Sequence, residues 1–292
     1  MSGDSPAPRS ERDWLTAHQI QARRRFGQNF LLEPRIPELI VERAELAPGG
    51  RVLEIGPGGG ALTDALLRAG QRVDAVELDQ SLLPLLEERF QAEIAAGLLQ
   101  LRQGDVLDLT EEAVPAGAIL FGNLPYAITT PILIWATRHR ARLDRAVVMV
   151  QREVAERIAA APGGKEYGSL TVFLRAQAEV RTLLKVGRSS FWPRPGVESS
   201  VIELRFVTPP PWPGEVPMLE RVLRAAFGQR RKTLENGLAH GLAIAKEEAA
   251  AVLSSLGLEP AVRAEMLTVA QFGRLTEELT ARRLLGSDRS SR

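Results

Sequence analysis

The sequence Asn-Leu-Pro-Tyr, residues 123–126, follows an apolar run at residues 118–121 and has side chains suited to alkylation of an aromatic amine. An exocyclic adenine amine is a poor nucleophile, because its lone pair is delocalised into the ring. Hydrogen bonds from that amine to the Asn123 side-chain oxygen and the Leu124 carbonyl would favour a pyramidal nitrogen, with its lone pair aimed at a methyl sulfonium. Pro125 fixes the turn, and Tyr126 offers a ring on which a flipped or unpaired base can stack. The simpler interpretation of these residues is an ordinary Pro-Tyr turn.

A glycine cluster is the second candidate binding element. Gly56, Gly58 and Gly60 stand between a predicted strand and a predicted helix, where backbone can approach a ligand that a Cβ would exclude. Glu77 closes the next predicted strand, 21 residues after Gly56. A carboxylate at this spacing accepts hydrogen bonds from the ribose hydroxyls of an adenosine-containing cofactor. The combination predicts such a cofactor, whereas the glycines alone would indicate only a tight turn.

The glycine spacing favours S-adenosylmethionine over a dinucleotide. The dinucleotide pattern is Gly-x-Gly-x-x-Gly, but this chain has Gly-x-Gly-x-Gly, preceded by Glu54 and with Pro57 in the loop. S-adenosylmethionine has no pyrophosphate that needs a helix N-terminus. Asp105 follows the third predicted strand. Its carboxylate either accepts from the adenine amino group of the cofactor or caps a turn.

Strand-like and helix-like segments alternate in the order expected of an α/β fold with a Rossmann-like, doubly wound sheet. The predicted strands span residues 51–56, 72–79, 98–109, 118–125, 145–150, 180–186 and 199–207, and the first helices span residues 61–69 and 81–97. The loop between the last two strands is too rich in Pro and Gly for a crossover helix, so these strands should form an antiparallel hairpin. The candidate residues then meet at the carboxyl edge of the sheet.

Three segments are predicted from changes in composition. Residues 1–25 are expected to be a flexible N-terminal arm, and residues 26–207 the S-adenosylmethionine-dependent methyltransferase domain. Residues 208–214 form a Pro-rich linker, and the chain from Val216 on has Leu and Ala at helical spacing with glycine breaks. Residues 208–292 are therefore predicted to be a small all-helical domain, and the basic cluster at residues 230–232, where its first predicted helix ends, makes it the predicted RNA-binding domain.

The charges nearly cancel, with 37 basic and 36 acidic side chains, so an anionic partner must be held by local basic clusters. Two clusters are candidates for RNA contacts: Arg23, Arg24 and Arg25, and Arg230, Arg231 and Lys232. As phosphate anchors they would position RNA without reading its sequence. Alternatively, the second cluster is a solvated helix end, where the helix dipole favours positive charge.

Other features narrow the class of protein. The chain has no Cys and three widely spaced His residues, which argues against a metal site. Its N-terminal region has no apolar segment typical of a secretory signal, and no run is long enough to span a membrane. We expect a cytoplasmic monomer without a membrane partner.

Taken together, these motifs resemble the bacterial small-subunit (16S) ribosomal RNA adenine N6,N6-dimethyltransferases, which are class I S-adenosylmethionine enzymes. The resemblance runs from about Phe26 into the C-terminal domain. It is carried by FGQNFL, EIGPGGGALT, VELD, GDVLDL, GNLPYAITTPI, QREVAERI, FWPRPGVESSV and AFGQRRKTLENGL. This chain departs from the family at Glu33 and in VESS (197–200), where Asp is commoner, but both changes keep charge or polarity.

The resemblance implies roles for individual residues. Asn29 and Leu31 would join Gly56, Gly58, Glu77, Asp105 and Asn123 around the cofactor. Phe191 and Tyr126 would sandwich the target adenine, while Trp192 is expected to pack. The implied substrate is a pair of adjacent adenosines near the 3′ end of the small-subunit RNA, each methylated twice at N6, within an immature 30S particle.

Three alternative functions remain at this point. An NAD-dependent oxidoreductase would explain the glycines and Glu77, but it leaves residues 122–126 without a role. A non-catalytic ribosome assembly factor would keep the fold, although the complete Asn123–Tyr126 motif argues against that as the sole role. A large-subunit RNA dimethyltransferase of the antibiotic-resistance type shares the core motifs. The segments AFGQRRKTLENGL and FWPRPGVESS favour the small-subunit enzyme.

Overall fold

The computed structural model describes residues 11–229, 232–259 and 261–285 and divides the chain into two compact units. The first unit comprises the chain up to Ala155 together with Arg181–Phe206, and the second comprises Glu156–Val180 and the chain from Val207. Residues 156–180 thus join the second unit, whereas the sequence-based division assigns them to the methyltransferase domain. The end of the first unit at Phe206 lies one residue from the predicted boundary.

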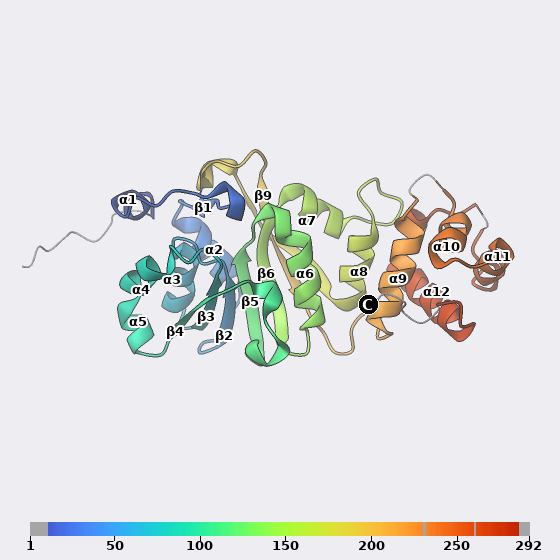
Figure 1. Cartoon of the computed structure of the whole chain (residues 1–292), viewed down its shortest axis with the longest axis horizontal. Helices are drawn as coiled ribbons and strands as arrows, with labels where there is room; N and C mark the ends of the chain where they lie inside the picture. Colours follow the sequence, from blue (N-terminus) through green and yellow to red (C-terminus); the bar gives the residue numbers. More distant parts are fainter. Residues whose placement is uncertain (1–10, 230–231, 260, 286–292) are drawn as a thin grey trace, which may run out of the picture. The chain divides into compact units, whose positions relative to one another are not determined.

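The first unit is built on a sheet that has seven strands among the described residues (Figure 1). They are β2 (Arg51–Ile55), β3 (Arg72–Glu77), β4 (Leu99–Gln103), β5 (Ala118–Asn123), β6 (Leu143–Gln151), β7 (Glu179–Val186) and β9 (Ser199–Arg205). Their order is β4-β3-β2-β5-β6-β9-β7. Strands β2 to β6 pair in parallel, and β9 runs antiparallel to β6. The predicted α/β sheet with an antiparallel last part is confirmed.

The central strands are apolar on both faces because helices cover both sides of a parallel sheet. Val52 and Leu53 on β2 point to opposite faces, and neither is exposed. Helices α3 (Ala61–Arg68), α4 (Leu83–Arg89) and α5 (Gln91–Ala95) contact the β3–β4 half, and α6 (Thr129–Arg138) contacts β6 (Figure 1). Helix α2 (Arg35–Ala44) contacts α3, and α7 (Arg152–Ala159) follows β6 directly in the chain.

The predicted helix at residues 81–97 is wrong in one respect, because the chain breaks it into α4 and α5 at Phe90. Pro84 lies in the first turn of α4, as the sequence indicates. Phe90 leaves the helical region, with φ −115° and ψ 29°, and is 3% exposed. A Cβ placed on Gly60 would lie 2.6 Å from the Phe90 ring. The break therefore brings an aromatic ring under the glycine loop.

The N-terminal part of the first unit packs against the sheet domain, which corrects the expectation of a flexible arm for its described residues. Helix α1 (Glu11–Ala17) buries Trp14 and Leu15 to 4% and 2% exposure. The short 3₁₀ helix η1 (Arg24–Phe26) and strand β1 (Phe30–Leu31) follow. Strand β1 pairs antiparallel with β8 (Phe191–Trp192), a strand that the sequence does not predict. Residues 1–10 of the predicted arm lie outside the described residues.

The described secondary structure of the second unit is helical, apart from Glu179 and Val180 at the start of β7. It contains α8 (Ser169–Gln177), α9 (Val216–Phe227), α10 (Leu234–Leu242), α11 (Lys246–Ser255) and α12 (Val269–Ala281). Gly237 and Gly241 lie inside α10 rather than breaking it. A Cβ on Gly241 would lie 2.5 Å from the Cα of Ala225, so these glycines permit close packing of α10 on α9.

Further short 3₁₀ helices are η2 (Val106–Asp108), η3 (Glu111–Ala113), η4 (Tyr126–Ile128), η5 (Arg188–Ser190) and η6 (Ala264–Met266). Among the described helices, none has the length and apolar character needed to cross a membrane. The same residues contain no group of three or more His, Asp or Glu side chains arranged to hold a metal ion.

Candidate cofactor and substrate site

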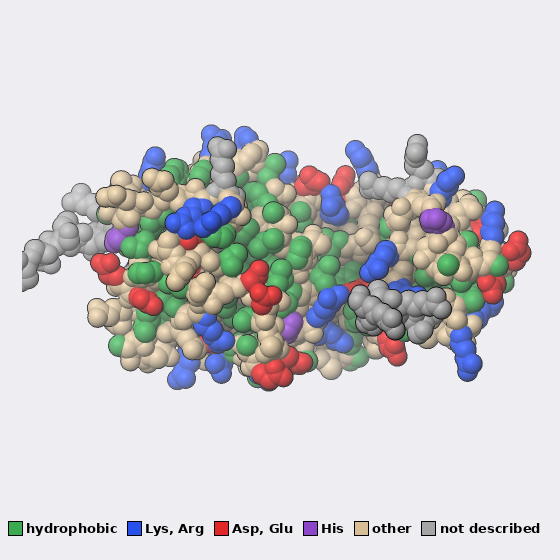
Figure 2. Space-filling model, in the orientation of Figure 1, with side chains coloured by type: hydrophobic (Ala, Val, Ile, Leu, Met, Phe, Trp, Pro, Cys, Tyr) green, Lys and Arg blue, Asp and Glu red, His purple; other side chains and the backbone are tan. Residues whose placement is uncertain are grey.

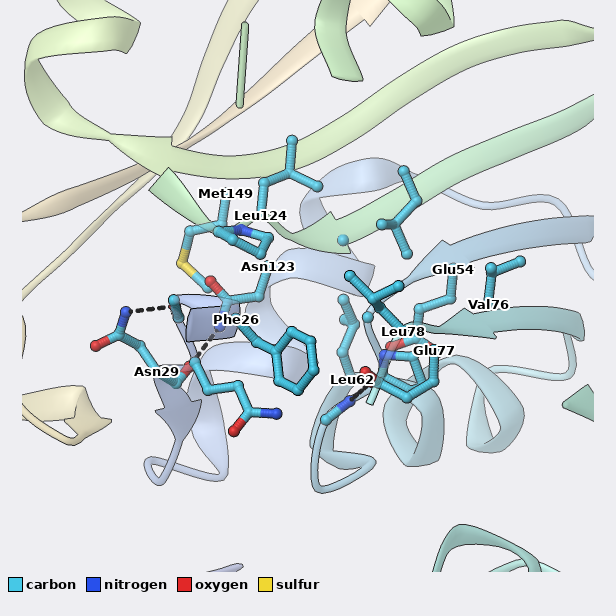
Figure 3. Close-up of a pocket in the computed structure, with 18 of the residues that line it drawn as sticks. Phe26, Asn29, Glu54, Leu62, Val76, Glu77, Leu78, Asn123, Leu124 and Met149 are labelled. Atoms are coloured by element: carbon cyan, nitrogen blue, oxygen red, sulfur yellow. Dashed lines mark hydrogen bonds between the residues drawn. The ribbon is translucent and has the colours of Figure 1, made fainter. Parts of the chain in front are cut away.

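One cavity in the first unit collects most of the predicted site residues at the carboxyl ends of β2 to β5 (Figure 3). Asn29, Leu31, Gly56, Gly58, Glu77, Asp105, Asn123, Leu124 and Pro125 all line it. Figure 3 shows Asn29 and Asn123 on one side of this cavity, Glu54 and Glu77 on the other, and Phe26 between them. The strand order places these residues together, because β3, β2 and β5 are neighbours in the sheet.

The glycine loop after β2 adopts backbone conformations that favour glycine. Gly56, Gly58 and Gly60 have φ values of 62°, 59° and 92°, in the left-handed region where other residues are strained. The amide of Gly58 donates to Glu77 Oε2 over 3.1 Å. The loop therefore forms a cradle in which Pro57 is the only residue with a side chain, next to a carboxylate, and this arrangement fits the adenosine and methionine parts of S-adenosylmethionine.

Glu77 is held in place by backbone amides and is 6% exposed. Its Oε1 accepts from the Asp79 amide over 2.8 Å, and its Oε2 accepts from Gly58. Burial raises the pKa of the Glu77 carboxyl above its ordinary value, backbone hydrogen bonds from Asp79, Gly58 and Leu78 oppose that shift, and the Asp79 charge adds to it. Each carboxylate oxygen has a further lone pair. Glu77 therefore keeps acceptor capacity for two ribose hydroxyls, and its role as the ribose acceptor stays a prediction.

Glu54 lies beneath the glycine loop as a second buried carboxyl, 1% exposed. Thr63 Oγ1 donates to Glu54 Oε2 over 2.7 Å. Burial raises the pKa of Glu54 to about 8, and the neighbouring Glu77 charge adds to the effect while the Thr63 hydrogen bond opposes it. Around neutral pH this side chain is therefore mostly protonated.

Asp105 follows β4 and lines the cavity, but it also caps the 3₁₀ helix η2. Its Oδ1 accepts from the Leu107 amide over 2.9 Å. Turn capping thus occurs, and the second carboxylate oxygen is left for a ligand. The two interpretations of Asp105 are compatible with each other.

The Asn123 side chain has a defined orientation. Its Nδ2 donates to the main-chain oxygen of Asn29 over 2.8 Å. A carbonyl oxygen can only accept, so this contact fixes which end of the amide is nitrogen and leaves Oδ1 as a free acceptor. The Leu124 amide donates to the Met149 carbonyl over 3.1 Å, and the Pro125 carbonyl accepts from the Ile128 amide over 3.1 Å. These contacts hold the turn that presents the Asn123 oxygen.

The structure does not bring Tyr126 and Phe191 into the wall of this cavity. The Tyr126 hydroxyl lies 3.0 Å from Ser199 Oγ, and the ring is half-buried. Phe191 is only 3% exposed and belongs to the hydrophobic core, because β8 pairs it with Leu31 on β1. An open slot between the two rings is therefore not present in this structure, and the adenine sandwich stays a prediction.

The first basic cluster is partly engaged within the protein. Arg23 Nη1 lies 2.8 Å from Asp79 Oδ1, and Gln28 Nε2 donates to Asp79 Oδ2 over 2.9 Å. The Arg25 guanidinium lies over the Phe26 ring, 4.6 Å from its centroid. Arg24 is in η1. Burial acts to raise the pKa of Asp79, but hydrogen bonds from Ser81 and Gln28 outweigh it and lower the pKa below its ordinary value.

The second basic cluster follows α9, which ends at Phe227 as the sequence indicates. Lys232 is exposed, whereas Arg230 and Arg231 lie outside the described residues. Figure 2 shows further Lys and Arg side chains along the upper and lower edges of the first unit, around a hydrophobic area. Asp and Glu side chains are interspersed with them on the same face.

Sequence reasoning missed several cavity-lining residues: Phe26, Leu78, Val106 and Met149. Leu78 is 42% exposed although it is large and apolar. Leu78 could have been identified from the sequence because it directly follows Glu77 at a strand end. An apolar side chain there can cover a flat ring bound beside that carboxylate. Met149 has no such signal, since it comes to the cavity only through the pairing of β6 with β5.

Comparison with known proteins adds independent evidence. A family model described as ribosomal RNA adenine dimethylase matches residues 19–281. The chain belongs to the ribosomal RNA adenine dimethylase family. It is 42% identical to the ribosomal RNA small subunit methyltransferase A of Pseudomonas aeruginosa, over 90% of this chain and 96% of that protein. The same named protein of Phenylobacterium zucineum is also 42% identical, over 93% of each chain.

Solved structures agree with this family assignment. A dimethyladenosine transferase from Plasmodium falciparum superposes with a TM-score of 0.75 at 26% identity, covering 86% of this chain and 98% of that one. The 23S rRNA methyltransferase ErmE gives a TM-score of 0.66, also at 26% identity, covering 86% and 99% of the two chains. The fold, the membership of a family of rRNA adenine dimethylases and the use of S-adenosylmethionine are thereby established for this dimethylase.

Proposed function

We propose that this dimethylase transfers methyl groups from S-adenosylmethionine to N6 of two adjacent adenosines near the 3′ end of small-subunit ribosomal RNA, two to each. The main support is the orientation of Asn123, whose oxygen is left free by the hydrogen bond to Asn29, in the cavity that also contains Glu77. The relatives named as small-subunit methyltransferases at 42% identity support the choice of RNA. The resemblance to ErmE, at 26% identity, gives less support to a large-subunit substrate.

Different residues of the chain would bind the cofactor and activate the adenine amine. The glycine cradle and Glu77 hold the cofactor, which supplies an electrophilic methyl group on a positively charged sulfur. Asn123 Oδ1 and the Leu124 carbonyl accept hydrogen bonds from the adenine amine and favour a pyramidal nitrogen. With the cofactor bound, the nitrogen would bond to the methyl carbon while the carbon–sulfur bond breaks, and alkylation would make the amine acidic. Its proton can then pass to solvent without a strong general base.

We further propose that the substrate is RNA within an immature 30S particle, and that the enzyme acts as a monomer in the cytoplasm. Arg230, Arg231 and Lys232 would hold phosphates, which positions the RNA without reading its sequence. A rearrangement that brings the Tyr126 and Phe191 rings to either side of the target adenine would accompany RNA binding, because the described structure has Phe191 buried in the core.

The decisive experiment is nucleoside mass spectrometry with site mapping. Unmethylated small-subunit particles and naked large-subunit RNA are each incubated with the enzyme and S-adenosylmethionine. N6,N6-dimethyladenosine at two neighbouring positions near the 3′ end of the small-subunit RNA is the expected result. Methylation of the large-subunit RNA alone would reassign the substrate. A lack of methylated adenosine in both, despite measurable cofactor binding, would favour an assembly factor.

A further inference from the structure

A second hollow in the first unit lies between helix α1 and Trp192. Its polar rim consists of Arg12, Thr16, Gln19 and Gln21, and its apolar part of Leu15, Ile20 and the Trp192 ring. We name this feature the α1 hollow. It is distinct from the cofactor cavity, with which it shares no lining residue among those described.

The rim side chains of the α1 hollow are available to a ligand. Arg12, Gln19 and Gln21 are exposed, and their side chains have no hydrogen-bond or ion-pair partner within the described part of the chain. Arg12 presents fixed guanidinium donors, and each glutamine presents both a donor and an acceptor. A set of this kind suits a ligand that carries a negative charge and a hydrogen-bonding edge.

The backbone at Gln19 fixes part of this rim. Gln19 has φ 52°, in the left-handed region, which a non-glycine residue seldom adopts. The Ile20 amide donates to the Leu15 carbonyl over 2.9 Å, and this contact ends α1 and turns the chain. Ile20 is then buried at 8% exposure while Gln19 and Gln21 face solvent beside it. The glutamines are therefore presented from an anchored turn.

Trp192 supplies a flat aromatic surface. It is half-buried, and its ring stacks on Phe30 with the centroids 6.1 Å apart and an interplanar angle of 20°. Pairing of β8 with β1 sets Trp192 opposite Phe30, and Phe30 also lines the cofactor cavity. The α1 hollow thus adjoins the cofactor cavity through this pair of rings. An aromatic ring beside a cation and two amides is a combination that binds a nucleobase by stacking, with its phosphate held by the cation.

We infer that the α1 hollow binds a nucleotide of the single-stranded RNA next to the target adenosine, with its base on Trp192 and its phosphate at Arg12. This inference rests on the proposed function, in which two adjacent adenosines react in turn. When one base is flipped into the catalytic cavity, the neighbouring base loses a stacking partner, and the α1 hollow offers an aromatic surface on which that base can stack. Base stacking on an aromatic side chain tolerates any base, so the site would select for single-stranded geometry rather than for sequence.

The test is binding of a short single-stranded oligonucleotide that contains the two adenosines, measured by fluorescence anisotropy with saturating S-adenosylhomocysteine. This assay needs no methyl transfer, so it is independent of the proposed reaction. We expect Trp192→Ala to weaken binding by about tenfold or more and Trp192→Phe to retain most of it. The Arg12→Ala/Gln21→Ala double variant should also weaken binding. The matched control for Arg12 is Arg72→Ala, an exposed arginine at the amino end of β3 that does not line the α1 hollow.

A second comparison separates stacking from indirect effects. An oligonucleotide with an abasic site beside the target adenosine should bind the wild-type protein as weakly as Trp192→Ala binds the intact oligonucleotide, and combining both changes should add little. Unchanged binding by Trp192→Ala would overturn the inference. So would an equal loss of S-adenosylhomocysteine affinity, because Trp192 would then act through Phe30 on the cofactor cavity. If wild-type enzyme failed to methylate the particle while these binding results held, the proposed function would fail and the base site would stand.

Discussion

The side-chain nitrogen of Asn123 lies 2.8 Å from the main-chain oxygen of Asn29, a residue 94 positions earlier in the chain. This contact joins the end of β5 to the segment just before β1 and determines which atom of the Asn123 amide remains free. The oxygen that is left can accept a hydrogen bond from an adenine amine. The catalytic proposal therefore depends on a contact between two distant parts of the sequence.

Replacing Asn123 by Ala should reduce kcat for methylation by about 10²-fold or more, since one positioned hydrogen-bonding group aimed at the reacting atom has that order of effect. The affinity for S-adenosylhomocysteine should remain close to that of the wild type, because the glycine cradle and Glu77 are unchanged. Single-turnover methylation of small-subunit particles and titration calorimetry measure the two quantities. Normal turnover by Asn123→Ala would show that the amine is activated in another way.

Glu77→Gln should mainly weaken binding of the cofactor. The Gly58 amide and the Asp79 amide both donate to this carboxylate, and an amide NH₂ in place of one oxygen would face a donor with a donor. Hydrogen bonds to a charged group contribute about 1.5–3 kcal/mol, which corresponds to a loss of roughly 10-fold to 150-fold in S-adenosylhomocysteine affinity.

The control for this experiment is Glu88→Gln, an exposed carboxylate on α4. Calorimetric titration of both variants and of the wild type gives the comparison. If Glu77→Gln bound S-adenosylhomocysteine as well as Glu88→Gln does, Glu77 would not be the ribose acceptor.

Arg23 was predicted to contact RNA, but its ion pair with Asp79 suggests a role in cofactor binding. The backbone N–H of Asp79 donates to the Glu77 carboxylate, which is proposed to bind the ribose. Loss of Arg23 should therefore make the position of this carboxylate less well defined. The side chain of Arg23 is 43% exposed, and a pair of this kind contributes about 0.2–1 kcal/mol. Arg23→Ala should therefore weaken S-adenosylhomocysteine binding by up to about fivefold.

Arg35→Ala serves as the control for Arg23, because Arg35 pairs with the exposed carboxylates Glu38 and Glu42 on α2, outside the cavity. Calorimetry and the salt dependence of RNA binding are measured for both variants. A flatter salt dependence for Arg23→Ala, with unchanged cofactor affinity, would support the original RNA assignment instead.

The sequence predicts those features of the site that depend on local pattern. The strand ends carrying Gly56, Glu77 and Asp105 follow from hydrophobic runs and turn residues, and parallel pairing brings such ends to one edge. The burial of Phe191 was not predicted, because strands β1 and β8 have two residues each and pair across 160 positions of sequence. The break at Phe90 likewise depends on its contact with Gly60, since nothing in residues 81–97 interrupts the helical pattern. The burial of Phe191 and the helix break at Phe90 both depend on contacts between residues far apart in the chain, and such contacts cannot be deduced from the local pattern of a single sequence.

Lys232 and the two arginines before it should contribute to the salt dependence of RNA binding. Removing a side chain that binds one phosphate should reduce the slope of log K against log salt by about 0.7–0.9. Lys232→Ala should therefore flatten the slope by nearly one, and replacement of Arg230, Arg231 and Lys232 together should flatten it further. Arg274→Ala, an exposed arginine on α12, controls for the loss of one positive charge. Equal slopes for Lys232→Ala and the wild type would reject the phosphate contact.

The buried Glu54 carboxyl makes a prediction about pH and stability. Burial raises its pKa to about 8 in the folded state, against 4.5 as the ordinary value. The folded state thus binds this proton more tightly than the unfolded state does. Its contribution to stability is complete below about pH 4.5 and is lost as the pH rises toward 8. Glu54→Gln removes the titrating carboxyl. As the pH rises over that range, the free energy of unfolding of the variant should therefore fall less than that of the wild type, by on the order of a few kcal/mol.

Denaturant unfolding at a series of pH values between 5 and 8.5 (roughly the interval in which the two protonation states exchange) measures this difference. Glu77 and Glu11 also have raised pKa values and give the same sign, so only the comparison of variant with wild type isolates Glu54. Glu87→Gln, an exposed carboxylate on α4, is the matched control and should follow the wild-type curve. Parallel curves for Glu54→Gln and the wild type would mean that Glu54 stays ionised beneath the glycine loop. The carboxylate would then have to be stabilised by a partner other than Thr63, because one hydroxyl does not compensate for the burial of a full charge.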